Sequence, residues 1–447
     1  MSYLDKIIKQ SPWLIALANI NEDIHLLRLK EFRYIHHENS FLTHHFEDGI
    51  YIVTGPRQIG KSTHLKMLIQ QHINEKNKDN FLYFNCDLLD KKQDIVDLVE
   101  EYLKNFPSNT RRFILLDEIT SVKDSFLAIK FLVDSGHFKN ITYILTGSNT
   151  ISIKKTGEYL PGRRGKGIDF IFNPLSFKQY INLVHPKLNV TYSLDISEKE
   201  YLALKQKAPL DKYLNDYLVS GGIPRVINEF LNKGAIDQDI FSMYRAWITS
   251  EIAKADKKEF IAKSILERVL FSLGSDISYN AFAQDSGIGS HNTVYDYLDF
   301  FINCNVLTQI FHFDIHQQKV NYRKNKKIYF NDPFIYSVIE AWLTGKPSQD
   351  YEYLSNPILK SRIIENLVLI QLKNFYQDIF YYKEIQEIDF VTKDLLLEIK
   401  YQNKIIKDDY AFLLKHENNR ILVTKKDFKR ADGLLWIPIE IFLLLSL

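Results

Sequence analysis

Residues 55–62 of the 447-residue chain read GPRQIGKS and directly follow an apolar stretch, Ile50–Thr54. This run fits the pattern G-x-x-x-x-G-K-[ST], a loop that cradles nucleotide phosphates. Gly55 and Gly60 permit the tight turn and the close backbone approach that such a loop needs. The apolar stretch predicts a buried strand, and residues 61–75 have helical spacing. Strand, glycine loop and helix in this order predict an α/β nucleotide-binding domain.

The chemistry of the loop indicates how a nucleotide would bind. Successive backbone N–H groups would point at the phosphates, helped by the positive end of the following helix. Lys61 would reach the β and γ phosphates of ATP, and the Ser62 hydroxyl would bind Mg²⁺. The residues predicted to contact the nucleotide are Gly55, Pro56, Arg57, Gln58, Ile59, Gly60, Lys61, Ser62 and Thr63.

A second motif ends another predicted strand, Phe113–Asp117, where four apolar residues are followed by Asp117 and Glu118. Asp117 would hold Mg²⁺, directly or through water, and Glu118 would activate the attacking water. Two solvated turn acids would give the same short pattern. Its position downstream of the phosphate loop favours a catalytic site that contains Lys61 and Glu118.

Three more apolar stretches, Phe81–Asn85, Ile141–Thr146 and Ile168–Phe172, are separated mostly by helical segments. Strands that alternate with helices predict a parallel sheet covered on both faces. We expect this ATPase core to span residues 46–180, after an N-terminal helical segment at residues 1–45.

Two groups of polar residues near the core are candidates for contact with the γ phosphate. Ser148 or Asn149, with Thr146 also possible, follows a strand where such ATPases sense that phosphate, although an ordinary turn would look the same. Arg163 and Arg164 lie in a glycine loop before the last core strand. A guanidinium there could neutralise transition-state charge in cis or across a subunit, or the two could form a solvated surface pair.

The motifs together resemble a known family. GPRQIGKST, LLDEI, LTGSN, LPGRRG, NPLSF and SGGIPR occur in the order seen in the predicted AAA-type ATPases of prokaryotes, which are related to the archaeal ATPases and the STAND signalling ATPases. The resemblance implies a helical lid whose Gly-x-Pro motif, here Gly222–Pro224, places Pro224 near the adenine base. The residues themselves show a break in a helical region, which a helix–helix turn would also produce.

Residues 181–255 have a helical pattern that fits this lid, and residues 256–340 predict three helices followed by a hairpin. That order predicts a winged helix-turn-helix. We expect the hairpin loop to carry Lys319, Tyr322, Arg323, Lys324, Lys326 and Lys327, and a DNA groove to be faced by Ser290, His291, Asn292 and Tyr295. An interdomain lever or a solvated basic hairpin would show the same pattern.

After a linker at residues 341–354, residues 355–447 predict a C-terminal α/β domain. Asp389 followed by the sequence Glu-Ile-Lys at 398–400 resembles the core of PD-(D/E)XK nucleases. Alternation puts Glu398 and Lys400 on one strand face, and the preceding hairpin would bring Asp389 beside them. The carboxylates could hold Mg²⁺ against a phosphodiester while Lys400 steadies the nucleophile, and Glu365 matches the extra acid of such folds. A structural ion pair without cleavage is the alternative.

Composition limits the partners. A net charge of +2 gives no global attraction to nucleic acid, so any DNA-binding surface must be local. Two distant cysteines imply neither a disulfide framework nor a cysteine zinc site. The chain shows neither a signal-peptide pattern nor an apolar run long enough to span a membrane, so we expect a cytoplasmic protein with no membrane partner.

The sequence therefore predicts a multi-domain α/β protein that binds and hydrolyses ATP with Mg²⁺ and acts on DNA through a winged helix and a nuclease-like domain. The alternative is an ATP-gated signalling scaffold that forms homo-oligomers and binds a partner without cutting nucleic acid. The large C-terminal region argues against a simple NTPase for a small substrate.

Overall fold

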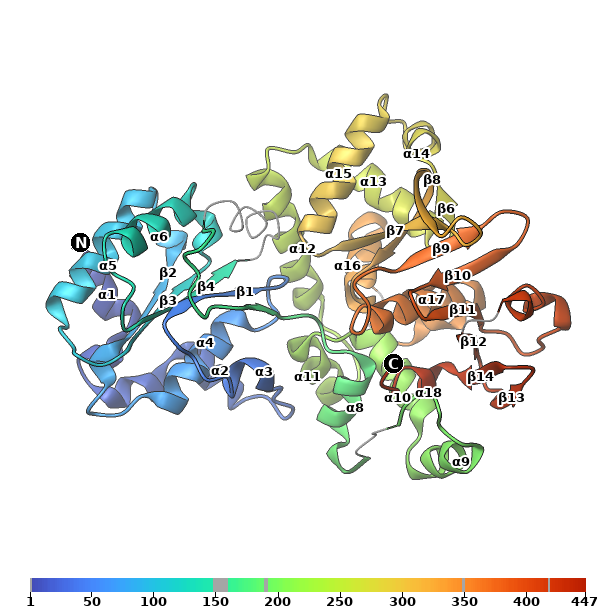
Figure 1. Cartoon of the computed structure of the whole chain (residues 1–447), viewed down its shortest axis with the longest axis horizontal. Helices are drawn as coiled ribbons and strands as arrows, with labels where there is room; N and C mark the ends of the chain where they lie inside the picture. The colour runs from blue at the N-terminus through green and yellow to red at the C-terminus, as the bar shows by residue number, and fades with distance from the viewer. Residues whose placement is uncertain (1, 148–159, 189–191, 348–349, 417–418) are drawn as a thin grey trace. The chain divides into compact units, whose positions relative to one another are not determined.

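The computed structural model describes residues 2–147, 160–188, 192–347, 350–416 and 419–447 (Figure 1). The chain divides into two compact units. The first unit comprises Met1–Asn173 and Asn303–Asn305, and the second comprises Pro174–Ile302 and Val306–Leu447. The helices do not include one that is both long and apolar enough to cross a membrane, within the part of the chain that the structure describes.

The first unit is built on a five-stranded parallel sheet of order β2-β3-β4-β1-β5. Its strands are β1 (Gly49–Thr54), β2 (Phe81–Asn85), β3 (Arg112–Asp117), β4 (Ile141–Gly147) and β5 (Asp169–Ile171). Strands β1 and β4 are buried along their whole length, as their β-branched and apolar residues predict. Strand β4 lies between β1 and β3, so the predicted parallel α/β core, with an additional strand, is confirmed.

Helices and short 3-10 turns surround this sheet. The helices are α1 (Tyr3–Gln10), α2 (Ile24–Leu29), α3 (Asn39–Leu42), α4 (Lys61–His72), α5 (Lys92–Asn105) and α6 (Ser125–Asp134), and the 3-10 turns are η1 (Pro12–Leu14), η2 (Leu17–Glu22), η3 (Lys78–Asn80), η4 (Cys86–Leu88) and η5 (Ile119–Ser121). The N-terminal segment belongs to this unit, because the buried Trp13 indole donates a hydrogen bond to the Phe81 carbonyl oxygen at 2.9 Å.

The second unit contains a nine-stranded mixed sheet of order β13-β14-β12-β11-β10-β9-β7-β8-β6. Its strands are β6 (Asp276–Ile277), β7 (Leu307–Asp314), β8 (Lys319–Phe330), β9 (Phe380–Lys383), β10 (Glu387–Val391), β11 (Leu395–Lys400), β12 (Asn419–Thr424), β13 (Lys429–Ala431) and β14 (Leu434–Pro438). Strands β7 and β9 pair in parallel, with Phe311 opposite Phe380 and His312 opposite Tyr381. The predicted hairpin and the predicted C-terminal domain therefore share one sheet.

The helices of the second unit are α8 (Phe177–Val184), α9 (Glu198–Lys207), α10 (Leu210–Ser220), α11 (Pro224–Lys233), α12 (Gln238–Lys254), α13 (Glu259–Ser272), α14 (Tyr279–Asp285), α15 (His291–Asn303), α16 (Pro333–Thr344), α17 (Pro357–Leu372) and α18 (Ile439–Phe442). Four 3-10 turns accompany them: η6 (Pro186–Leu188), η7 (Glu352–Ser355), η8 (Lys407–Asp409) and η9 (Leu413–Lys415). Helices α10, α12 and α13 all pack against α16.

The glycine pair between α10 and α11 has a structural reason. Gly221 adopts φ +62°, and its backbone passes so close to Asp332 that a Cβ would lie 2.1 Å from the carboxylate. The Gly222 N–H donates to the same carboxylate at 2.7 Å, and a Cβ on Gly222 would lie 2.1 Å from the Leu175 carbonyl oxygen. This close packing requires both glycines, whether or not the segment also contacts a nucleotide.

The hairpin differs from its prediction. Strand β8 begins at Lys319, and a short turn that follows Asp314 closes the hairpin, with the Asp314 carboxylate accepting from the His316 and Gln317 N–H groups at 2.9 Å each. The prediction that the basic residues lie in the hairpin loop is wrong, because they belong to β8. Lys319, Lys326 and Lys327 pair with β7, whereas residues 322–324 lie where the register of that pairing shifts. Lys326 and Lys327 are buried. The part that stays exposed comprises Lys319, Tyr322, Arg323 and Lys324.

Candidate functional site

The phosphate-binding loop in the first unit connects β1 to α4. Gly55 has φ +146° and Gly60 has φ +98°, which side chains rarely tolerate, and Gly60 caps the start of α4. The buried Lys61 ammonium donates to the carbonyl oxygens of Gly55 and Pro56 at 2.9 and 3.0 Å. The ammonium of Lys61 and the amino end of the 12-residue helix α4 therefore both lie at this loop.

Two acids at the end of β3 lie beside this lysine. Glu118 follows the strand in a left-handed conformation (φ +50°), and one of its carboxylate oxygens lies 3.9 Å from Lys61 Nζ. Burial raises the pKa of Glu118, opposed by Lys61, and Asp117 raises it further. Sequence motifs that are more than fifty residues apart thus meet at one site.

Asp117 is almost fully buried and held from two strands. The Tyr83 hydroxyl on β2 donates to one carboxylate oxygen at 2.7 Å, and the Thr146 hydroxyl on β4 donates to the other. The Thr146 oxygen also accepts from the Glu118 N–H at 2.8 Å. Of the three predicted phosphate sensors, Thr146 thus has a defined place in the site, whereas Ser148 and Asn149 lie outside the described residues.

A histidine links the N-terminal segment to the start of α4. His64 Nε2 accepts from the Glu38 N–H at 3.0 Å, and Nδ1 lies 2.9 Å from the Gly60 carbonyl oxygen. This pattern requires a proton on Nδ1 and none on Nε2. Burial lowers the pKa of His64 to about 4, in agreement with a neutral ring. His64 thus positions the first turn of the helix that carries Lys61.

The two candidate arginines lie near the amino ends of the strands, whereas the phosphate-binding loop follows the carboxyl end of β1. Arg163 forms an ion pair with Asp134 at 2.6 Å, and Arg164 forms one with Asp169 at 2.6 Å. Arg164 also donates to the carbonyl oxygen of Ile50, near the start of β1, at 3.4 Å. The phosphate-binding loop follows the far end of that strand, roughly 13 Å away at 3.3 Å per residue. This placement disfavours action in cis.

Pro224 lies in the second unit, as the first residue of α11. The helical segment that the sequence predicts as a lid begins with α8, whose capping box is formed by Ser176 and Gln179. The contact between Pro224 and adenine stays a prediction.

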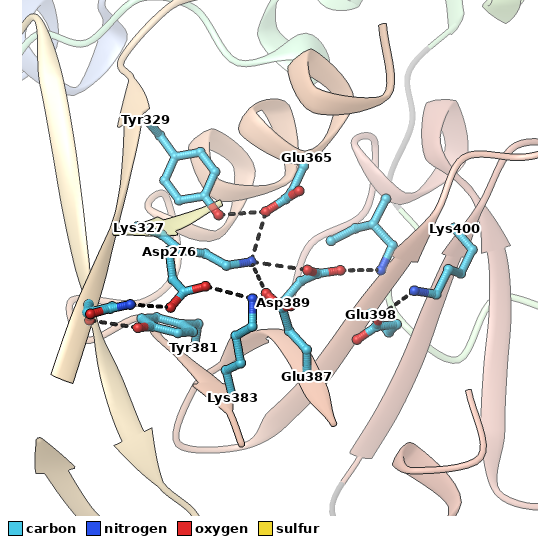
Figure 2. A network of polar contacts seen from close by, with 12 residues as sticks. Asp276, Lys327, Tyr329, Glu365, Tyr381, Lys383, Glu387, Asp389, Glu398 and Lys400 are labelled. Atoms are coloured by element: carbon cyan, nitrogen blue, oxygen red, sulfur yellow. Dashed lines mark hydrogen bonds and ion pairs between the residues drawn. The ribbon is translucent and has the colours of Figure 1, made fainter. Parts of the chain in front are cut away.

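A network of charged side chains lies in the second unit (Figure 2). The ammonium of Lys327, on β8, is completely buried, and its Nζ lies 3.2 Å from Glu365, 2.8 Å from Glu387 and 3.2 Å from Asp389. The Tyr329 hydroxyl, from the same face of β8, donates to Glu365 at 2.6 Å. Glu365 lies on helix α17, and Glu387 and Asp389 lie on β10, so Lys327 of β8 pairs with acids from both a helix and another strand of the sheet.

The predicted Asp389, Glu398 and Lys400 are brought together. Asp389 accepts from the Ile399 N–H at 2.9 Å, and Lys400 Nζ lies 2.7 Å from one oxygen of Glu398 (Figure 2). The other oxygen of Glu398 is buried with no hydrogen-bond partner among the described residues. Alternation along β11 and the neighbouring β10 therefore produced the predicted juxtaposition.

Electrostatics in this network follow from burial. Burial disfavours the charge on Lys327, but the surrounding carboxylates outweigh it and hold the lysine pKa well above its usual value. Burial also raises the pKa of Glu365 to about 7, against the effect of Lys327. Burial, and then Asp389, raise the pKa of Glu398 well above its usual value. Lys327 is therefore a charged cation among crowded carboxylates.

The two sites differ in how they fit Mg²⁺. In the first unit, the Ser62 hydroxyl and the Asp117 carboxylate are oxygen ligands of the kind Mg²⁺ prefers, beside a loop built for phosphate. In the second unit, the Lys327 ammonium pairs with Glu365 and Asp389, two of the three carboxylates that the sequence assigns to a metal. Over the described residues, the side chains include no group of three His, Cys, Asp or Glu arranged to hold a metal ion.

Sequence reasoning missed Lys327 and Glu387 as members of this network. Glu387 lies two residues before Asp389 on β10, so strand alternation alone could have found it. Lys327 carried a weaker signal: it alternates with Tyr329 at the apolar end of β8, a position where a charged side chain needs partners. Lys383, which lies 3.2 Å from Glu387 and 2.6 Å from Asp276, completes the cluster.

Comparisons with known proteins find a known domain family in the first unit. Residues 47–181 match the family model described as an AAA domain, and residues 211–349 match a domain of unknown function, DUF8612. An uncharacterized protein of Methanocaldococcus jannaschii is 26% identical over 410 residues, which are 85% of this chain and 82% of that protein.

Two solved structures align with this chain at lower sequence identity than the protein of M. jannaschii. The RuvB Holliday junction branch migration motor of Thermotoga maritima is 14% identical, with a TM-score of 0.30, over 58% of this chain and 81% of that chain. The ORC2 protein of Aeropyrum pernix in its ADP form is 11% identical, with a TM-score of 0.35, over 75% and 94%. Neither similarity carries an argument about function. The match of the family model and the parallel sheet with its P-loop motif both indicate that residues 47–181 have the fold of an AAA domain.

Proposed function

We propose that this protein is a Mg²⁺-dependent ATPase that acts on DNA through its second unit. The observation that carries the ATPase part is that Lys61, in the loop after β1, lies beside Asp117 and Glu118 at the carboxyl end of β3, with only β4 between the two strands. A loop lysine beside two strand-terminal acids is what phosphoryl transfer requires: groups that hold the phosphates, and groups that hold a metal and a water.

Each residue has a role in this proposal. Lys61 and the N–H groups at the start of α4 would bind the β and γ phosphates. Ser62 and Asp117 would hold Mg²⁺, which when bound neutralises phosphate charge. Glu118 would accept a proton from the attacking water. Thr146 would position both acidic residues, because its hydroxyl donates to the Asp117 carboxylate and accepts from the Glu118 N–H.

Two further parts of the site are proposals of the same kind. The placement of Arg163 and Arg164 at the amino edge of the sheet supports action on the nucleotide of a neighbouring subunit, which would require a homo-oligomer. Pro224 would contact adenine from the helical segment of the second unit.

The DNA part rests on the order and surface of the second unit. The succession α13, β6, α14, α15, β7, β8, with the three strands paired antiparallel, is the order of a winged helix-turn-helix. The exposed Lys319, Arg323 and Lys324 on β8 offer cations for phosphates, and Tyr295 is exposed on α15. The proposed action on DNA therefore starts with backbone contacts from β8.

The acidic cluster favours a second candidate function. Lys327 pairs with Glu365 and Asp389, two of the three carboxylates that a metal-dependent nuclease would need here, and Lys400 pairs with the third, Glu398. This supports an ATP-gated scaffold whose C-terminal domain binds a partner without cleaving it.

One experiment separates the two candidates. We would measure ATP hydrolysis with and without duplex DNA, and test DNA cleavage with Mg²⁺ and Mn²⁺. Stimulation by DNA supports the first function, while ATP-dependent oligomerisation without DNA affinity supports the scaffold.

The DNA surface has its own test. Replacing Arg323 and Lys324 by alanine should weaken DNA binding and lower the salt dependence by about one unit of slope for each lost phosphate contact. The exposed Lys139 of the first unit provides the control, since K139A should change neither quantity. Unchanged DNA affinity in the double variant would contradict the assignment of β8.

A further inference from the structure

The acidic cluster of the second unit already contains a cation. A lysine ammonium has three N–H donors, and Lys327 has three carboxylates within 3.2 Å. Its side chain is fully buried, so these carboxylates replace the water that would otherwise solvate it. The three carboxylates therefore surround the single positive charge of the Lys327 ammonium.

We propose that the Lys327 ammonium occupies the place of a divalent cation between Glu365, Glu387 and Asp389, so that lysine and metal exclude one another there. The inference does not depend on the proposed ATPase or on DNA binding, because it concerns only the charges of this cluster.

Geometry explains the exclusion. Mg²⁺ binds carboxylate oxygens at 2.0–2.1 Å, and Mn²⁺ suits the same oxygen ligands. A metal between the same three carboxylates would fall in the volume that Lys327 Nζ fills, and two adjacent positive charges would repel each other strongly in a buried setting. The metal can enter only where the ammonium is absent.

The cluster also has an acceptor to spare. The second oxygen of Glu398 is buried and has no hydrogen-bond partner among the described residues, and Glu398 lies near enough to Asp389 for the two charges to interact. A buried carboxylate oxygen without a hydrogen-bond partner lowers the stability of the fold. Such an oxygen can also serve as a ligand of a cation. Replacing Lys327 by a neutral side chain would leave Glu365, Glu387 and Asp389 without their cation, so these side chains would have to move inward to bind a metal in its place.

The test measures Mn²⁺ binding to the full-length, nucleotide-free protein, by calorimetry or by the electron paramagnetic resonance of free Mn²⁺. We expect Lys327→Met to gain one Mn²⁺ site relative to wild type, with affinity roughly tenfold tighter or more than any site of the wild type at this cluster. The gain should disappear in the double variant K327M/D389N. A metal site elsewhere, such as one at Asp117, would be common to all the proteins and would cancel in the comparison.

Lys383→Met provides the matched control. Lys383 is a lysine of the same cluster and lies 3.2 Å from Glu387, but its other ion pair is with Asp276 rather than with Glu365 or Asp389. The K383M variant removes one positive charge without emptying the central place, so it should gain no Mn²⁺ site. A gain in K383M equal to that in K327M would show a general charge effect and overturn the proposal.

Thermal unfolding keeps the test decisive if K327M is unstable. Mn²⁺ should then raise the unfolding temperature of K327M and leave that of K327M/D389N unchanged. The proposal fails if Mn²⁺ neither binds nor stabilises K327M. It also fails if wild type already binds one Mn²⁺ that Asp389→Asn removes.

Discussion

The hydroxyl of Thr146 donates a hydrogen bond to the carboxylate of Asp117 on the neighbouring strand β3. The same oxygen accepts from the N–H of Glu118 at 2.8 Å, so one side chain contacts both acidic residues of the proposed ATPase site. Thr146→Val keeps the shape and removes the hydroxyl. We expect ATP hydrolysis to fall about tenfold or more, because the acids lose their common partner, while ATP affinity changes little.

The control for this variant lies on the same strand. The Thr142 hydroxyl donates to the Glu47 carbonyl oxygen at 2.8 Å, near the opposite end of β4. Thr142→Val and Thr146→Val should each lower the free energy of unfolding by about 1–3 kcal/mol, because each removes the hydroxyl of a buried threonine from its hydrogen bond. Only Thr146→Val should lower kcat. Equal effects of both variants on kcat would contradict the role of Thr146.

Lys61 and Glu118 should separate nucleotide binding from hydrolysis. Lys61→Ala should abolish ATP turnover with the fold intact, because the loop loses the charge that meets the phosphates. Glu118→Gln should lower hydrolysis by about 100-fold or more and preserve ATP binding, because a neutral amide cannot accept the water's proton. Turnover and fluorescent-nucleotide binding measure the two effects. Full turnover in K61A would refute the site.

Glu440 should make stability depend on pH. It is buried on α18, and burial raises its pKa to about 7 from a value of 4.5 in the unfolded chain. Between these values the folded protein binds more protons than the unfolded chain, so the free energy of unfolding falls as pH rises from about 4.5 to 7. Glu440→Gln should remove this decline, which amounts to roughly 3 kcal/mol at most.

Urea unfolding at several pH values tests the Glu440 prediction. At neutral pH the Gln variant should be more stable than wild type, and at pH values below about 4.5 the two should converge. A Gln variant that is less stable than wild type at neutral pH would show that the carboxylate contributes favourably there.

Gly222 should resist substitution for steric reasons. A Cβ there would meet the Leu175 carbonyl oxygen at 2.1 Å, so we expect Gly222→Ala to cost about 3 kcal/mol or more in unfolding free energy. Gly234 ends α11 at φ +77° and has open space around it, so Gly234→Ala should cost only about 1–2 kcal/mol. Comparable losses of the two variants in thermal unfolding would contradict the steric role of the Leu175 carbonyl oxygen.

The sequence predicted the first unit well for a local reason. The phosphate loop, the buried strands and the acids after Phe113–Leu116 all lie in short continuous runs whose patterns determine both conformation and chemistry. Asp389, Glu398 and Lys400 were also predictable as neighbours, since hairpin pairing and alternation bring them together.

The rest could not be predicted because it depends on contacts between distant segments. Lys327 joins the acidic cluster only through the pairing of β7 with β9, which no local pattern encodes. Thr146 was one of three possibilities until β3 and β4 were known to be adjacent. The length of β8 was underestimated because its first half is polar and lacks the apolar signal of a buried strand.

The parallel pairing of β7 with β9 has a mechanical consequence. Hydrogen-bonded strands form one sheet from β6 to β13, and the pairs Phe311–Phe380 and His312–Tyr381 join the hairpin directly to the C-terminal strands. A force applied at the tip of the hairpin would be carried across the sheet as a twist instead of being absorbed by a tether. We therefore expect the hairpin and the C-terminal strands of the second unit to move together and to unfold in one cooperative transition.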